Sequence, residues 1–227
     1  AVKLTENIFR SVNIALVNEL KLIYEKMGID VWEVIDAAKT KPFGFMAFYP
    51  GPGLGGHCIP IDPFYLTWKA REFDIATRFI ELAGQVNTAM PEHIVRRVGD
   101  VLDQHSGRGL NGADILLLGV AYKKNIDDTR ESPALKIMDL LRARGARVSY
   151  YDPYVPEVPP TREHMTLAGM KSIPWSGAEI ARYDAALICT DHDCVDYKLL
   201  AQHAKLVFDS RNAMKDFAGY QAHLVKV

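Results

Sequence analysis

The chain has 227 residues, of which 48% are hydrophobic and 24% charged, proportions that exclude a disordered or fibrous protein. Its 27 basic and 28 acidic residues leave a net charge of −1, which argues against a nucleic-acid partner. No apolar run approaches the roughly 20 residues that cross a bilayer, and three cysteines are too few for a disulfide framework. We therefore expect a cytoplasmic protein with no membrane partner.

The first segment predicts one long amphipathic helix. Its apolar residues recur every three or four positions, as a single helix face requires: Leu4, Ile8, Val12, Leu16, Leu20, Ile23 and Met27. Gly28 follows, where a helix end favours positive φ, and Asp30 should then cap a short helix through Ala38. Since the chain starts with Ala1 and has no N-cap ahead of Lys3, we expect it to be the downstream part of a longer protein.

The remainder of the N-terminal half also predicts helices. Asp62 should be the N-cap and Pro63 the first-turn residue of a helix that runs through Phe73. Residues 75–89 and 91–104 predict two more helices, or one rod kinked at the proline between them.

From residue 107 the pattern changes to alternating strands and helices. A helix opens at Ser132 and runs through Ala143. Short apolar runs predict four buried strands, at residues 114–119, 147–151, 184–190 and 206–209. Such strands with helical crossovers favour a parallel sheet. We therefore expect an α/β protein, with an all-helical domain at residues 1–106 followed by a Rossmann-like parallel-sheet domain at residues 107–227.

Residues 40–60 are rich in proline and glycine, and the segment Gly51-Pro-Gly53-Leu-Gly55-Gly56 has the spacing of a dinucleotide fingerprint. The context argues against that interpretation, because no apolar strand precedes the segment and no helix starts at Gly56. A loop whose backbone passes close to a ligand fits better, with a simple flexible turn as the alternative.

Cys58 follows this loop next to a predicted helix N-terminus. Backbone N–H groups there favour a thiolate and could hold an oxyanion, which makes Cys58 a candidate nucleophile. The alternatives are a small buried hydrophobe for Cys58, a purely capping role for Asp62, and an ordinary polar loop residue for His57. A hydrolase pair of His57 and Cys58 is geometrically poor, since adjacent residues on a tight loop rarely face each other.

Four segments resemble the UDP-glucose/GDP-mannose dehydrogenase family of nucleotide-sugar 6-dehydrogenases. They are residues 1–7 with Asn18-Glu19-Leu20, residues 53–63, residues 122–132 and residues 208–211. The family has an N-terminal NAD domain, a helical middle domain that dimerises and a C-terminal UDP domain. The resemblance implies that this chain carries only the last two, so alone it should lack most of an NAD site and be inactive.

The resemblance also implies a reaction. It is the NAD-dependent four-electron oxidation of the C6 alcohol of a UDP-sugar to a carboxylate, through a thiohemiacetal and a thioester on Cys58. Lys3 and Asn7, four residues apart on one helix face, are expected to stabilise the oxyanion at C6. Asp62 is expected to orient or deprotonate the hydrolytic water.

Binding residues follow from the same resemblance. The sugar would be bound by Tyr49, Gly51, Gly53, Leu54 and Gly55. Because lysine and arginine complement phosphate, UDP would be bound by Tyr122, Lys123 and Arg211. NAD would contact Cys58 and Arg130. The alternative for the charged residues is a solvated surface, or a self-neutralising patch over residues 123–131.

The substrate is inferred from the residues around Cys58 and from one difference from the UDP-glucose branch of the family. The segment around Cys58 is closest to the branch that oxidises UDP-N-acetylglucosamine, with UDP-N-acetylmannosamine dehydrogenases as near relatives. The UDP-glucose branch has an arginine upstream of its cysteine that reaches the neighbouring subunit's substrate, whereas residues 39–45 contain none. Either Lys41 replaces that arginine or the contact is lost, which weakens UDP-glucose as the substrate.

We also expect a homodimer through the helical domain, or a higher oligomer, whose product supplies surface polysaccharide or lipopolysaccharide synthesis. The competing hypotheses are a non-catalytic nucleotide-sugar-binding dimerisation module and a cysteine acyltransferase or hydrolase. No metal is expected, because Cys189 and Cys194 with one histidine between them do not have a zinc spacing.

Overall fold

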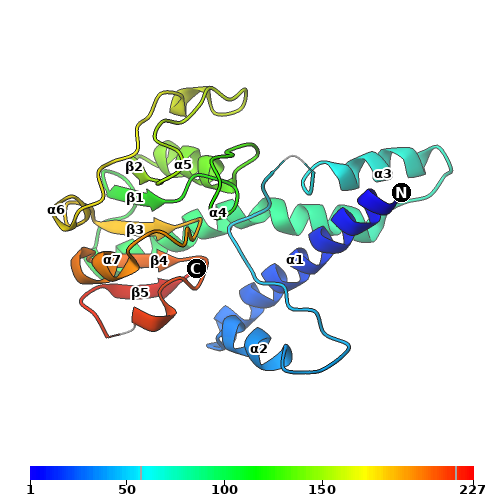
Figure 1. The fold of residues 1–227 in the computed structure, drawn as a ribbon, viewed down its shortest axis with the longest axis horizontal. Helices are drawn as coiled ribbons and strands as arrows, with labels where there is room; N and C mark the ends of the chain where they lie inside the picture. The colour runs from blue at the N-terminus through cyan, green and yellow to red at the C-terminus, as the bar shows by residue number, and fades with distance from the viewer. Residues whose placement is uncertain (57, 218) are drawn as a thin grey trace. The chain divides into compact units, whose positions relative to one another are not determined.

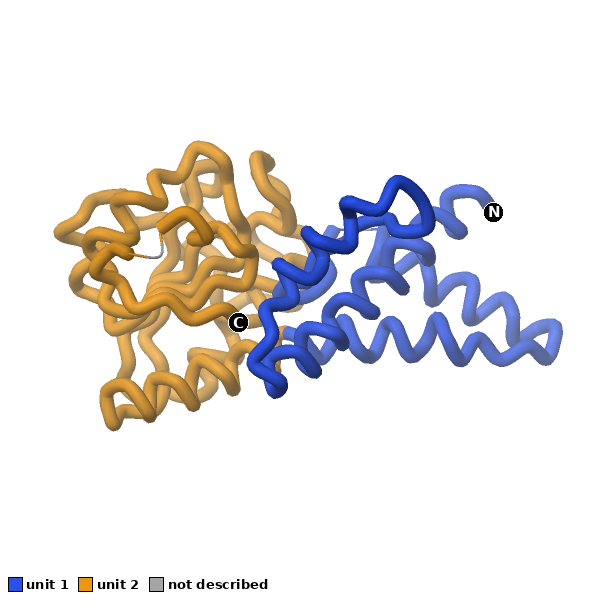
Figure 2. The backbone as a smooth tube through the Cα atoms, turned by 90° about the horizontal axis from the view of Figure 1, so that it is seen from below, with its two compact units in different colours: residues 1–90 blue, residues 91–227 orange. Residues whose placement is uncertain are grey.

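The computed structural model describes residues 1–56, 58–217 and 219–227. By its internal contacts the chain divides into two compact units, Ala1–Met90 (unit 1) and Pro91–Val227 (unit 2), shown in Figure 2. This division falls inside a helix, whereas the sequence pattern predicts the domain boundary at its end, between residues 106 and 107. That boundary stays a prediction. His57, weighed above as a loop residue or hydrolase partner, lies outside the described residues.

Unit 1 is built from helices (Figure 1). They are α1 (Val2–Met27), α2 (Val31–Ala38), α3 (Asp62–Arg71) and the first half of α4 (Arg78–Ser106). Gly28 ends α1 in the left-handed conformation at φ 69°. The Asp30 carboxylate caps α2 by accepting a hydrogen bond from the Trp32 N–H. Both features confirm the sequence prediction.

One expectation for unit 1 is wrong, and one pair of alternatives is decided. Asp62 is the first helical residue of α3 and not its N-cap, because Ile61 holds the cap position and makes no side-chain cap. Residues 78–106 form one helix with Pro91 inside it, which confirms the single-rod alternative and not the two helices. A proline costs a helix one hydrogen bond and a local clash, and here the flanking Met90 and Ile94 are almost fully buried, which offsets that loss.

Unit 2 is a five-stranded sheet with helices. The strands are β1 (Asp114–Leu118), β2 (Arg147–Tyr151), β3 (Ala185–Ile188), β4 (Leu206–Asp209) and β5 (His223–Lys226). All neighbours are parallel and the spatial order is β2-β1-β3-β4-β5, which runs from top to bottom in Figure 1. Its helices are the second half of α4, α5 (Pro133–Ala143), α6 (Gly177–Ile180) and α7 (Tyr197–His203), with single turns at Met165–Leu167 and Lys215–Phe217.

The first four strands confirm the prediction, and β5 was missed. Alternate residues of β1 enter two separate hydrophobic clusters, Ile115 and Leu117 in one, Leu116 and Leu118 in the other, so this strand is buried on both faces. By contrast, β5 is exposed at both ends and half-buried between them. Its four residues therefore lack the continuous apolar run that made the inner strands recognisable.

The direction in which successive strands are added to the sheet reverses between β1 and β3, because β2 lies on one side of β1 and the later strands on the other. In doubly wound sheets of this order, ligands bind beyond the carboxyl ends of the strands at that point. Within the described residues, none of the helices is both long and apolar enough to cross a membrane.

Candidate active site

In unit 1, three of the predicted catalytic side chains meet at one carboxylate. Asn7 Nδ2 on α1 donates to Asp62 Oδ2 on α3 at 2.7 Å, and Lys3 Nζ lies 3.1 Å from the same oxygen. One turn separates Lys3 from Asn7, so both reach the start of α3. Asn7 and Asp62 are buried, whereas the Lys3 side chain is 68% exposed. The site therefore has a fixed, enclosed carboxylate–amide pair and a cation at its solvent side.

Cys58 completes this group. The backbone N–H groups of Ile61 and Asp62 donate to the Cys58 carbonyl at 3.2 and 2.8 Å, which turns the chain into α3 and places the cysteine one turn before it. The Lys3 ammonium lies close to both Asp62 and the Cys58 side chain, and these two neighbours, Asp62 first, raise the pKa of Lys3. The half-buried thiol is thus next to the Lys3 ammonium.

The glycine loop is held by buried asparagines that the sequence analysis did not assign this role. Asn18 Oδ1 accepts the Gly51 N–H at 3.0 Å, and Asn18 Nδ2 donates to Asn87 Oδ1 on α4 at 3.0 Å. Asn87 Nδ2 in turn donates to the Ser11 carbonyl at 2.9 Å. The sequence signal was available, because Asn7, Ser11 and Asn18 place polar groups on one buried side of α1 at helical spacing.

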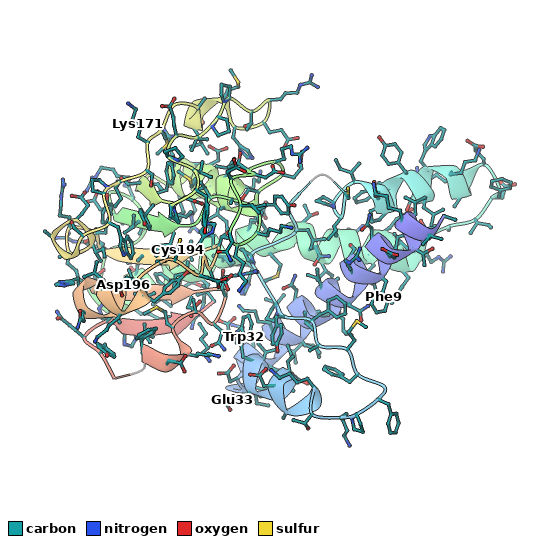
Figure 3. All side chains as sticks on the ribbon, viewed as in Figure 1. Phe9, Trp32, Glu33, Lys171, Cys194 and Asp196 are labelled. Carbon is teal, nitrogen blue, oxygen red and sulfur yellow. The ribbon has the colours of Figure 1, made fainter. Side chains whose placement is uncertain are left out.

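The predicted sugar-binding segment has its own local supports. Tyr49 stacks on Trp32 of α2, with ring centroids 5.4 Å apart, and its hydroxyl donates to Asp36 at 2.9 Å. Figure 3 labels Trp32. Gly53 and Gly56 adopt φ values of 138° and 81°, a conformation that side chains disfavour. Sugar binding by Tyr49, Gly51, Gly53, Leu54 and Gly55 stays a prediction.

In unit 2, the predicted UDP-binding residues stand at the carboxyl edge of the sheet. Tyr122 and Lys123 follow β1, with the Lys123 ammonium 5.7 Å from the Tyr122 ring centroid. Arg211 follows β4, and its Nε donates to Asp191, which follows β3, at 3.1 Å. Buried Asp209 shapes this turn by accepting the Arg211 and Met214 N–H groups. Burial raises the pKa of Asp209.

Arg130 makes an ion pair of the kind that the self-neutralising alternative expects. Its guanidinium contacts both Asp128 oxygens, at 2.6 to 3.1 Å, and this pairing lowers the pKa of Asp128 although partial burial opposes it. The side chain is nevertheless 67% exposed, so the same cation is accessible to an anionic ligand.

The other two cysteines differ in their exposure to solvent. Cys189 is buried at the end of β3, and burial raises the pKa of its thiol. Cys194, labelled in Figure 3, is exposed. In the part of the chain that the structure describes, no group of three or more His, Cys, Asp or Glu side chains could hold a metal ion.

Comparison with known proteins identifies the family. Residues 1–89 match the UDP-glucose/GDP-mannose dehydrogenase family, central domain, and residues 116–216 match that family's UDP binding domain. The chain is 34% identical over 224 residues to a UDP-N-acetyl-D-mannosamine dehydrogenase of Methanococcus maripaludis, covering 94% of this chain and 48% of the relative. It is 35% identical over 191 residues to an NDP-N-acetyl-D-galactosaminuronic acid dehydrogenase of Ralstonia nicotianae, covering 84% and 42%.

Solved structures agree. The UDP-D-ManNAc dehydrogenase from Pyrococcus horikoshii has a TM-score of 0.81 at 33% identity, over 99% of this chain and 50% of that one. The chain thus spans about half the length of the relatives it matches. Matches of this extent over both units show that the chain belongs to the UDP-glucose/GDP-mannose dehydrogenase family.

Proposed function

We propose that this chain is the catalytic and UDP-binding part of an NAD-dependent UDP-N-acetylhexosamine 6-dehydrogenase. The observation that carries the proposal is the convergence of Lys3, Asn7 and Asp62 beside Cys58. A thiol, a cation, an amide and a carboxylate at one place are what covalent oxidation of an alcohol to an acid requires. The family membership of both units supports the same reaction.

The residues can be given roles in the order of the reaction steps. After the C6 alcohol is oxidised to an aldehyde, the Cys58 sulfur adds to the carbonyl carbon and a thiohemiacetal forms. Oxidation of that adduct gives a thioester, which water hydrolyses to the carboxylate and the free thiol. At each stage negative charge develops on the C6 oxygen, and Lys3 is placed to stabilise it.

Asn7 and Asp62 support this chemistry. Asn7 Oδ1 accepts from Arg10 at 2.9 Å, which fixes the amide with its nitrogen toward Asp62 and leaves a second N–H for a substrate oxygen. The enclosed Asp62 carboxylate is positioned to orient the water that cleaves the thioester.

NAD, when bound, supplies the hydride acceptor for both oxidations. The exposed Arg130 guanidinium fits an anionic oxygen of such a cofactor, since a pyrophosphate oxygen could take the place of its Asp128 partner. The Cys58 thiol is the other group of this chain expected to face it.

The residues around Cys58 favour UDP-N-acetylglucosamine as the substrate, while the names of several relatives favour UDP-N-acetylmannosamine. We propose an N-acetylated UDP-sugar in either case. The uronic acid product would serve surface polysaccharide or lipopolysaccharide synthesis, and a reduced Cys58 requires a reducing compartment such as the cytoplasm.

We also propose that unit 1 dimerises. Val2, Phe9, Leu16 and Ile23 lie seven residues apart on α1 and are each 46–75% exposed, which forms an apolar seam suited to a partner helix. Phe9 also lines an apolar groove with Phe48. Leu16→Glu should convert the dimer to a monomer in analytical ultracentrifugation. Glu19→Gln on the same helix should leave it dimeric.

The test of the proposed reaction uses the full-length protein from the parent gene. It measures the NADH formed per UDP-sugar consumed, with UDP-N-acetylglucosamine, UDP-N-acetylmannosamine and UDP-glucose offered separately. A ratio of two with an N-acetylated sugar supports the proposal. Turnover with UDP-glucose alone overturns the substrate class, and UDP-sugar binding without any NADH favours the non-catalytic binding module.

A further inference from the structure

A buried carboxylate at the end of β2 joins three loops at the carboxyl edge of unit 2. Asp152 Oδ2 accepts the Val120 and Ala121 N–H groups at 2.8 and 3.1 Å, both from the loop after β1. Oδ1 accepts the Tyr154 and Val155 N–H groups of its own loop at 2.8 and 3.1 Å. The residue is 2% exposed.

The fifth partner of Asp152 is His192, from the loop after β3. Its Nε2 lies 3.1 Å from Asp152 Oδ2, and both side chains are fully buried. Burial alone raises the pKa of Asp152, but the hydrogen bonds from His192 and the backbone outweigh it and leave this pKa below its ordinary value. With its oxygens occupied and charged, Asp152 acts on the protein and not on a ligand.

The other nitrogen of His192 reaches back to the β1 loop. The Asn125 N–H lies 2.9 Å from His192 Nδ1. Since a backbone N–H can only donate, Nδ1 is the acceptor and the proton is on Nε2, toward Asp152. The imidazole is therefore a neutral bridge with a defined tautomer, covered by the Tyr154 ring at 5.0 Å between centroids.

These contacts hold both ends of one short segment. Val120 and Ala121 are tied to Asp152, and Asn125 is tied to His192. The Asn125 side chain also exchanges hydrogen bonds with Asp193, at 2.5 and 3.0 Å. Between the two anchors lie only Tyr122, Lys123 and Lys124. The two residues expected to contact UDP are thus on a segment clamped from inside the protein.

We propose that Asp152 and His192 are a positioning pair that holds Tyr122 and Lys123 in the conformation that binds the UDP diphosphate. This inference rests on the proposed function. Neither side chain touches the ligand. They restrict the conformations of residues 122–124 before the ligand binds. The conformational entropy lost on binding is then smaller, which raises the affinity without a new ligand contact.

Two nearly isosteric changes in the full-length protein separate the two bonds of His192. His192→Gln keeps a donor toward Asp152 and loses the acceptor for the Asn125 N–H. His192→Asn keeps that acceptor and loses the donor. We expect the glutamine variant to weaken UDP binding by about tenfold in calorimetry, the loss of one buried hydrogen bond, and to raise KM for the UDP-sugar while kcat changes less than about twofold. The asparagine variant should be affected less.

His164 provides the matched control. Its Nδ1 lies 2.5 Å from Asp139 elsewhere in unit 2, and its side chain is 11% exposed. His164→Gln therefore removes an Nδ1 hydrogen bond of a largely enclosed histidine away from the edge, there to a carboxylate instead of a backbone N–H. It should leave UDP affinity unchanged. Equal losses in the two glutamine variants, or wild-type UDP affinity in a folded His192→Gln protein, would overturn the proposal.

A measurement on the unmodified protein covers the case in which the variants fail to fold. Nitrogen chemical shifts of His192 should show a neutral ring with the proton on Nε2, and UDP should bind without changing that tautomer. A cationic ring, or a proton on Nδ1, contradicts the bridge. If UDP does not bind the unmodified protein at all, the proposed function fails together with this inference. Normal UDP binding with a cationic His192 ring, or with the proton on Nδ1, defeats the inference alone.

Discussion

The two units place their candidate functional side chains in different ways. In unit 1 the candidate reactive groups other than Cys58 come from helices, and Cys58 lies on the loop before α3. Buried side chains there bond one another, as Asn7 does with Asp62 and Asn18 with Asn87. In unit 2 the predicted binding groups stand on loops beyond buried strands, and buried carboxylates hold those loops by their backbone N–H groups. Changes in unit 1 should therefore alter chemistry, and changes in unit 2 should alter affinity.

The units also differ in what they leave uncovered. Among the described residues, all large hydrophobic side chains that are exposed lie in unit 1 except Tyr154, Met165 and Tyr220. Unit 2 has buried clusters on both faces of its sheet. An apolar surface of this extent marks an interaction site. We therefore expect the exposed apolar side chains of unit 1 to be covered by another protein surface, and unit 2 to need no such partner.

The largest expected effect separates chemistry from binding. Cys58→Ser in the full-length protein should reduce NADH formation by about 10³-fold or more, because the oxygen nucleophile cannot carry the thioester step. UDP affinity measured by calorimetry should not change. Cys194→Ser, which alters the exposed thiol of unit 2, is the control and should retain turnover. Normal NADH formation by the Cys58 variant would refute the covalent role.

A loss of about 10²–10³-fold in kcat is expected for Lys3→Ala, since one oxyanion donor disappears. The pH profile sharpens this. Contact with Asp62 raises the pKa of Lys3 by favouring its charged form, so Asp62→Asn should lower that pKa and move the alkaline limb of kcat to lower pH. Lys69→Ala, which breaks a surface ion pair with Glu72, should leave the profile in place. An unmoved alkaline limb in Asp62→Asn would contradict the assignment of Lys3.

A glycine in unit 2 tests how closely its loops approach. Gly119 has φ 78°, and a Cβ there would lie 2.4 Å from the Thr190 carbonyl oxygen. Gly119→Ala should cost about 2–4 kcal/mol of unfolding free energy, from backbone strain and from the clash. Gly169 has nearly the same φ of 79° with no atom within 4 Å, so Gly169→Ala should cost only about 1 kcal/mol. Urea unfolding measures the free energy of unfolding of both variants. Equal losses would mean that backbone strain alone, without the clash at Thr190, accounts for the effect of Gly119→Ala.

The smallest effect concerns the asparagine support of unit 1. Asn18→Ala leaves the buried Gly51 N–H without its acceptor, which should cost about 1–3 kcal/mol. Activity should fall more than UDP affinity, since the loop leads to Cys58. Asn13→Ala removes a bond only to its own helix, at Phe9, and should be nearly neutral. If kcat is unaffected in a folded Asn18→Ala protein, the glycine loop does not need this anchor.

Much of the fold followed from local pattern. The apolar spacing of α1, the Gly28 ending, the Asp30 cap and the four inner strands were all predictable, because each depends on residues close together in the chain. The strand β5 was not, since an edge strand of four half-exposed residues has no pattern of its own. Asp62 was placed on the correct helix but wrongly at its N-cap, since its carboxylate bonds to Asn7 of α1, which is distant in sequence.

The sequence by itself determined the family, the helical and sheet halves and the candidate residues Cys58, Lys3 and Asp62, since motifs and periodicity are written in consecutive residues. Only the tertiary structure decided which side chains share a hydrogen bond. The Asn18–Asn87 link and the Asp152–His192 bridge each join residues tens of positions apart. Their energy comes from satisfying polar groups that burial has removed from water, and burial exists only once the chain has folded.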